Sequence, residues 1–223
     1  MSIADNIHRF GKELPEGVKL VAITKTKPVE AIMEAYHAGH KIFGENKVQE
    51  LVEKYEALPG DIEWHMVGHL QSNKVKYIAP FVHLIHGVDR AKLFNVIDKE
   101  GRKNNRVIDI LMQFHIAREE TKFGFDLQEA EGLLESEAFR KYEFLKVKGV
   151  MGMATFTDDM NQVRSEFGEL VRIYNELKEK YFSADPEFKE ISMGMSGDYH
   201  VALEEGTTMV RIGSLIFGKR NIH

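Results

Sequence analysis

The chain has 223 residues, of which 43% are hydrophobic and 29% charged, the composition of an ordinary globular protein. Its 35 Asp and Glu residues outnumber its 30 Lys and Arg residues, so the net charge is −5 and we expect no binding to a nucleic-acid backbone. The chain contains no Cys, which excludes disulfide bonds, thiolate nucleophiles and Cys-ligated metal sites.

The first residues do not resemble a targeting segment. Residues 1–14 carry Asp5 and Glu13 among their apolar positions and contain no continuous apolar stretch, unlike a signal peptide. No window approaches the roughly 18 apolar residues of a membrane-spanning helix. We therefore expect a cytoplasmic protein with no membrane partner. Because no linker or repeat divides the chain, we expect a single domain over residues 1–223.

After an N-terminal helix indicated by Ile3, Ile7 and Phe10, predicted strands and helices alternate along the chain. The strands are expected at residues 18–23, 41–44, 62–67, 82–88, 107–116, 144–151, 189–193 and 209–213. Apolar residues at helical spacing follow most of these strands, and Asp126 and Glu129 have the spacing of a capping box. The chain has no Asn-Gly or Asp-Gly hairpin signal, so the pattern favours parallel strands.

Eight strand–helix units predict an α/β fold, a (β/α)8 TIM barrel with an extra N-terminal helix. Such barrels typically have about 250 residues and tolerate about 200, so the length is sufficient. An open doubly wound sheet is the alternative. It is less well supported, because the dinucleotide-binding pattern GxGxxG does not follow the first strand.

In such a barrel, functional residues lie just after the strands, at their C-terminal ends. Lys25 follows the first strand, where an amine with a lowered pKa can form a Schiff base. Lys27 could be a second cation that depresses the pKa of Lys25. The alternative is that both are solvated surface lysines.

The loops after the last two strands predict an anion site. Residues 194–198 and 213–214 are rich in Gly and Ser, which let backbone amides approach a phosphate, although two ordinary turns are the alternative. Arg211 lies within the last strand and is expected to point at a ligand or a carboxylate. Because strands one and eight are neighbours in a closed barrel, Lys25 and Arg211 should lie within about two strand spacings.

Ten histidines raise the question of a metal site, since His65 and His69 are four residues apart and His83 and His86 are nearby. The stretch HMVGH lacks the Glu of HExxH and falls on a predicted strand and turn, so we expect structural histidines and no metal site. The basic residues before the fifth strand are expected to lie in a solvated loop; they are Lys99, Arg102, Lys103 and Arg106.

Five stretches spread over nearly the whole chain resemble the signatures of one family. They are TKTKP at residues 24–28, FGENKVQE at 43–50, WHMVGHLQSNK at 64–74, GMSGD at 194–198 and VRIGSLIFG at 210–218. On these motifs the chain resembles the single-domain pyridoxal phosphate homeostasis proteins, whose fold is similar to the barrel domain of alanine racemases.

The resemblance implies that pyridoxal 5′-phosphate (PLP) is held as a Schiff base on Lys25. It further implies that the phosphate is bound by Ser196, Gly213 and Ser214, and that Arg211 faces the pyridine nitrogen. Other family positions lining the mouth are matched by Asn46, His65, Asn73 and Met151. Lys122 resembles a second family lysine that handles cofactor exchange. Thr24 and His115 depart from the family, in which Ser and Asn are usual.

Three functions remain open at this stage. The first is a PLP-binding protein of vitamin B6 homeostasis, a monomer or weak dimer without catalytic residues, that passes PLP to apo-enzymes. The second is a PLP-dependent amino-acid racemase, for which Tyr199 and His200 are the nearest candidates for a second acid–base group, although both are expected to pack on a short helix. The third is a barrel that binds another sugar phosphate. Visible absorbance separates the third function from the others, and amino-acid assays separate the first two.

Overall fold

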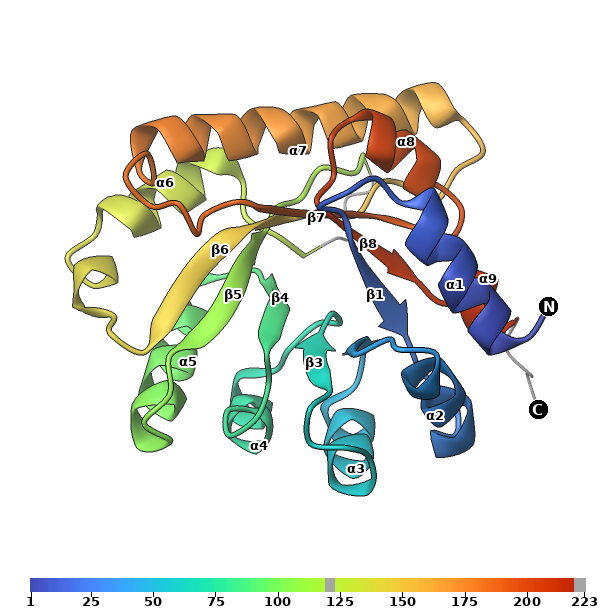
Figure 1. The fold of residues 1–223 in the computed structure, drawn as a ribbon. Coiled ribbons are helices and arrows are strands. Elements are labelled where there is room, and N and C mark those ends of the chain that lie inside the picture. The colour runs from blue at the N-terminus through green and yellow to red at the C-terminus, as the bar shows by residue number, and fades with distance from the viewer. Residues whose placement is uncertain (119–122, 219–223) are drawn as a thin grey trace.

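The computed structural model describes residues 1–118 and 123–218, and its parallel strands close into a barrel in chain order (Figure 1). The strands are β1 (Lys19–Ile23), β2 (Ile42–Glu45), β3 (Glu63–Met66), β4 (Leu84–Val88), β5 (Ile108–Gln113), β6 (Leu145–Met151), β7 (Glu190–Met195) and β8 (Met209–Ile212). The barrel closes where β1 pairs with β8, with Val21 opposite Arg211. The predicted barrel is therefore confirmed, and the open sheet is wrong.

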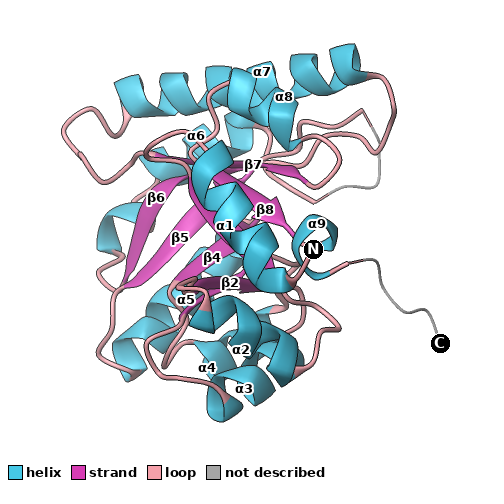
Figure 2. Ribbon diagram, turned by 45° about the vertical axis from the view of Figure 1, so that its right-hand side comes forward, coloured by secondary structure: helices cyan, strands magenta, loops and turns pink. Residues whose placement is uncertain are grey.

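Helices form a layer around the strands (Figure 2). They are α1 (Ile3–Glu13), α2 (Val29–His37), α3 (Val48–Ala57), α4 (Val75–Ile78), α5 (Ala91–Lys103), α6 (Leu127–Glu135), α7 (Met160–Lys180), α8 (Tyr199–Glu204) and α9 (Ser214–Phe217), with short 3-10 helices η1 (Ser72–Lys74) and η2 (Phe139–Lys141). No helix of the residues described has the length and apolar character needed to cross a membrane.

The predicted N-terminal helix α1 covers the side of the barrel where its first and last units meet. It lies between α8 and α2 (Figure 2), and the ring of Phe10 meets that of Tyr199 edge to face at 5.6 Å. Asn6 also donates to the carbonyl of Ile216 in α9 at 3.0 Å. The helix thus joins the two ends of the described chain.

The expected loop before β5 is wrong, because Lys99, Arg102 and Lys103 lie in α5. The helix forms because Leu93, Phe94 and Ile97 present a buried apolar face at helical spacing. Gly101 allows close packing at its end, since a Cβ there would lie 2.5 Å from the carbonyl oxygen of Phe144. The basic side chains occupy the exposed face. Arg106 follows the helix and donates to the carbonyl oxygens of residues 79 and 82.

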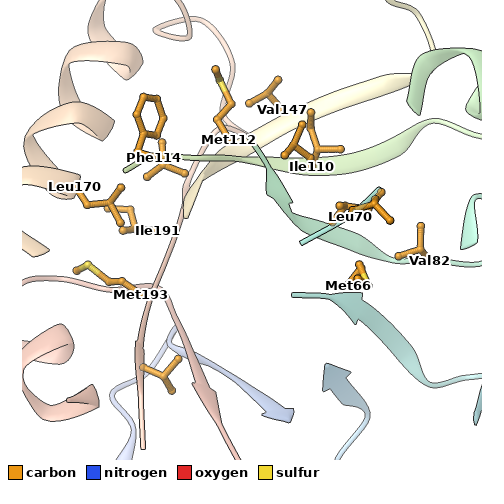
Figure 3. Packing of buried hydrophobic residues seen from close by; sticks show 14 of the residues in the cluster. Met66, Leu70, Val82, Ile110, Met112, Phe114, Val147, Leu170, Ile191 and Met193 are labelled. Atoms are coloured by element: carbon orange, nitrogen blue, oxygen red, sulfur yellow. The ribbon is translucent and has the colours of Figure 1, made fainter. Parts of the chain in front are cut away.

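Two apolar cores stabilise the barrel. The larger fills the space between strands and helices, and Figure 3 shows members of it such as Ile191 and Met193 of β7 with Leu170 of α7. The smaller core is formed inside the barrel by side chains on the inward face of the strands. Its members are Val21, Ile23, Val67, Leu84, Leu111, Met151 and Met209. Because side chains alternate between the two faces of a strand, Arg211 shares this inner face with Met209.

Candidate functional site

A cavity of about 500 Å³ opens at the C-terminal ends of the strands. It brings together six of the predicted site residues, namely Lys25, Asn46, Ser196, Arg211, Gly213 and Ser214. Lys27 and Asp198 also line it, as do the apolar side chains of Ile23, Val67, Met153, Met195 and Phe156. Lys25 and Arg211 thus line the same cavity, as barrel closure predicts. The volume suits a small-molecule ligand, for which pockets of about 300–1,000 Å³ are typical.

The backbone on both sides of Lys25 is held by a buried polar cluster. Lys54 of α3 donates to the carbonyl of Thr24 at 2.8 Å and pairs with the carboxylate of Glu45 at 2.5 Å. The hydroxyl of Thr24 donates to the same carboxylate at 2.5 Å. On the other side, the amide of Thr26 donates to Glu50 at 2.9 Å. Lys25 therefore projects from a fixed turn at the edge of the cavity.

Lys27 connects the first strand end to the last helix. Its ammonium group donates to the carbonyl of Phe217 at 2.9 Å and to that of Gly218 at 3.1 Å. These two carbonyls hold the amine of Lys27 against α9. The geometry gives Lys27 a role in closing the barrel between its first and last units.

The loops after β7 and β8 gather hydroxyl and amide groups on one wall. The amide of Gly213 lies 3.4 Å from the hydroxyl of Ser196, and Ser214 follows directly in the chain. The β7 loop is held by Asp198, whose carboxylate accepts from the amide of Met195 at 2.5 Å. Burial raises the pKa of Asp198. The loop also requires Gly194, since its φ is +93° and a Cβ there would lie 2.6 Å from that of Ala202. This wall can hold an anion through several donors.

Arg211 is buried, with 4% of its surface exposed, and forms part of the cavity wall. Its Nη1 donates to the hydroxyl of Ser192 at 2.7 Å, and its Nη2 donates to the carbonyl of Gly152 at 3.1 Å. Burial lowers the pKa of Arg211 to about 10. The guanidinium therefore stays charged at neutral pH and can only donate hydrogen bonds.

A buried polar chain leads from Arg211 through the barrel interior. Ser192 Oγ lies 2.9 Å from His86 Nδ1, and His86 Nε2 lies 3.0 Å from His65 Nδ1. Burial holds the pKa of both histidines well below the usual value, so both rings are neutral. Sequence reasoning missed Ser192, and it took His86 for a structural histidine. The sequence signal that could have indicated them is a polar residue within an otherwise apolar strand, His86 in β4 and Ser192 in β7.

Three residues expected at the mouth lie elsewhere. His65 points into the barrel interior and lines a small cavity at the opposite end, because it lies two residues before the mouth residue Val67. Met151 is fully buried in the inner apolar core. Asn73 is exposed on η1 and does not line the mouth cavity. Lys122 lies outside the described residues.

The two candidates for a second acid–base group also point away from the cavity. The hydroxyl of Tyr199 donates to Glu13 of α1 at 2.5 Å, and its ring packs against Phe10. The expectation that Tyr199 packs on the short helix is confirmed. His200 is exposed, with its Nε2 4.0 Å from Glu13.

Comparison with known proteins agrees with this fold. Residues 1–221 match the family described as "Alanine racemase, N-terminal domain". Alanine racemase from E. faecalis has a similar fold, with a TM-score of 0.73 and 13% identity, over 98% of this chain and 58% of that chain. At this identity the likeness concerns the fold alone.

Relatives with higher sequence identity are named pyridoxal phosphate homeostasis proteins. The "Pyridoxal phosphate homeostasis protein" of Aquifex aeolicus (strain VF5) is 44% identical over 203 residues, 91% of this chain and 87% of its own. That of Vibrio alginolyticus is 39% identical over 212 residues, 93% of this chain and 88% of its own. The structure of PipY from Synechococcus elongatus PCC7942, solved with PLP bound, has a TM-score of 0.88 and 30% identity, covering 97% of this chain and all of that chain.

Proposed function

This chain belongs to the family of pyridoxal phosphate homeostasis proteins, and we propose that it binds PLP covalently through Lys25 at the barrel mouth. The observation that carries the proposal is one cavity lined by an amine, a buried guanidinium and a wall of hydroxyls and amides. Each group matches one part of PLP: the aldehyde, the pyridine nitrogen and the phosphate. Condensation of the Lys25 amine with the aldehyde forms an imine and releases one water.

Within this proposal, Ser196, Gly213 and Ser214 bind the phosphate, because their donors share one wall of the cavity. Hydrogen bonds to a charged acceptor are stronger than those between neutral groups. Arg211 faces the pyridine nitrogen as a donor, and Asn46 also lines the cavity. Bound PLP supplies an electron-withdrawing ring. The residues of this chain bind the ring, orient it and set the hydrogen bond at its nitrogen.

The physiological role that we propose is the storage and delivery of PLP in vitamin B6 homeostasis, with PLP-dependent apo-enzymes as acceptors. The names of the relatives support this role. A cavity open to solvent at the strand ends also permits release. Localisation in the cytoplasm is part of the proposal, because the acceptor enzymes would have to share the compartment.

The covalent bond is tested by reducing the PLP-loaded protein with borohydride and mapping the mass increment. We expect one adduct per chain, on Lys25, and loss of the visible absorption band in Lys25→Ala. Lys47→Ala is the matched control, because Lys47 is an exposed lysine of the next strand end and does not line the cavity. An adduct found only on Lys27 would contradict the assignment.

Delivery is tested by mixing the loaded protein with an apo-enzyme and an excess of a phosphatase that hydrolyses free PLP. Direct transfer should restore enzyme activity under conditions in which the same amount of free PLP does not. Equal rescue by free PLP would contradict a delivery role and leave only binding.

A further inference from the structure

A second cavity, of about 50 Å³, lies at the opposite end of the barrel, where the strands begin. Its wall includes Glu63 and His65 of β3 and His83, which directly precedes β4. One ligand atom from each of these three side chains lies within 4.8 Å of the other two. Residues 63 and 65 share one face of β3, and residue 83 directly precedes the neighbouring strand β4.

His65 carries the observation that points to a ligand. His65 is 2% exposed, and its Nε2 is buried without a hydrogen-bond partner among the described residues. Its Nδ1 is already engaged by His86 at 3.0 Å. A histidine that ligates a metal through one nitrogen is usually oriented by a hydrogen bond at the other nitrogen. His65 has this arrangement.

Glu63 and His83 supply the remaining ligands. His83 Nε2 lies 3.4 Å from Glu63 Oε2. Two ligands that each lie about 2.1 Å from a tetrahedral zinc ion are also about 3.4 Å apart. The side chains of His83 and Glu63 are 52% and 44% exposed, so they can close on an ion held by the rigid His65. The rings of His65 and His83 already lie parallel, with centroids 5.5 Å apart.

The charge balance of the cavity favours a cation. Lys19 pairs with Glu190 at 2.5 Å, and Lys148 lies 3.5 Å from Asp109. Both ammonium groups in the wall are thus opposed by carboxylates. The negative charge of Glu63 is therefore the excess charge of the cavity wall, and it lies next to the imidazoles of His65 and His83.

We propose that Glu63, His65 and His83 bind a zinc ion at the N-terminal end of the barrel, with water as the fourth ligand. Two histidines, a carboxylate and a water form a common zinc ligand set. The sequence analysis named His83 among the nearby histidines but predicted no metal site. The sequence alone could not show that His83 comes next to His65, because the two meet only when β3 pairs with β4.

The site is also connected to Arg211. Zinc on His65 Nε2 requires the proton of that ring to lie on Nδ1, from which it is donated to His86 Nε2. His86 then donates from Nδ1 to Ser192, which accepts from Arg211 as well. Zinc binding would therefore determine the direction of both hydrogen bonds in the series His65–His86–Ser192.

The test is titration of the metal-free, full-length protein with Zn²⁺ by calorimetry and with Co²⁺ by visible absorption. We expect one ion per chain and the intense absorption of four-coordinate Co²⁺. Separately, His83→Ala and Glu63→Gln should each weaken Zn²⁺ binding more than tenfold. Both side chains are half exposed, so these variants should fold, which circular dichroism checks. His37→Ala, which removes an exposed histidine of α2, should bind as the unaltered protein does.

Three results would overturn the proposal. One is the absence of stoichiometric binding. The second is binding that survives unchanged in both His83→Ala and Glu63→Gln, which would place the ion elsewhere. The third is equal weakening in His37→Ala, which would indicate adventitious surface binding. None of these results depends on whether PLP is bound.

Discussion

The guanidinium of Arg211 and the hydroxyl of Ser192 form a buried hydrogen bond of 2.7 Å between the neighbouring strands β8 and β7. Ser192 in turn contacts His86 at 2.9 Å, inside the barrel. The orientation of Arg211 is therefore determined by the barrel interior. A ligand entering the mouth meets a donor that is already positioned, so little side-chain entropy is lost on binding.

The first prediction concerns the cluster beneath the Lys25 turn. Lys54→Met should destabilise the protein by about 3–5 kcal/mol, because it leaves the fully buried carboxylate of Glu45 without its cation. Denaturant unfolding measures the loss. Lys41→Met is the control, since Lys41 pairs with Asp61 on the surface and its removal should change the free energy of unfolding little. Equal losses in the two variants would show that the cluster does not stabilise the turn.

The second prediction concerns Ser196. Ser196→Ala should weaken binding of PLP by about 1.5–3 kcal/mol, a factor of roughly ten to a hundred, because it removes a hydrogen bond to a charged phosphate. Binding of pyridoxal, which lacks the phosphate, should change much less. Ser183→Ala, at an exposed position that does not line the cavity, serves as the control. If Ser196→Ala weakened both ligands equally, the residue would not belong to the phosphate site.

The third prediction concerns pH and the carboxylate of Glu166 in α7. This carboxylate accepts from the amide of Thr155 at 2.6 Å and from that of Arg118 at 3.3 Å, so it holds two loops at the barrel mouth. Burial acts to raise the pKa of Glu166, but the hydrogen bonds outweigh it and the pKa lies below the usual value. The folded-state pKa is thus lower than that of the unfolded chain.

A depressed pKa of this kind contributes stability above the unfolded-state pKa of about 4.3, and the contribution is lost as the pH falls through the folded-state value. Glu166→Gln should therefore be less stable than the unaltered protein at neutral pH, by about 1.5–3 kcal/mol. The difference should shrink below about pH 4. Glu179→Gln, at an exposed site on the same helix, should show no such trend. A difference for Glu166→Gln that does not vary with pH would refute the linkage.

Much of the fold follows from local sequence patterns. The capping box of Asp126 and Glu129 is present as predicted, with hydrogen bonds of 2.7 and 3.1 Å. Each strand is found within a few residues of its expected range. The meeting of Lys25 with Arg211 could also be predicted, because ring closure brings the first and last strands together.

The interior of the barrel could not be predicted in the same way. The hydrogen-bonded series from His65 through His86 to Ser192 includes a direct contact between residues 106 positions apart, His86 and Ser192. Those contacts depend on the register of β3, β4 and β7 and on which strand face turns inward. The placement of His65 at the mouth failed for this reason, since a shift of two residues along a strand moves a side chain about 6–7 Å toward the other end.

The last prediction is that the PLP-loaded protein turns over no amino acid at a physiological rate. A PLP enzyme uses the ring as an electron sink, which is deepest when a carboxylate keeps the pyridine nitrogen protonated. Arg211 stays charged and can only donate, so it leaves that nitrogen unprotonated. Racemization also needs a second acid–base group opposite the lysine. Tyr199 does not supply it, because its hydroxyl is hydrogen-bonded to Glu13 and burial raises its pKa to about 12.

Chiral chromatography of D- and L-alanine and serine with saturating PLP measures the rate. Turnover of about 1 per second or faster that disappears in Lys25→Ala would establish an enzyme in place of a carrier.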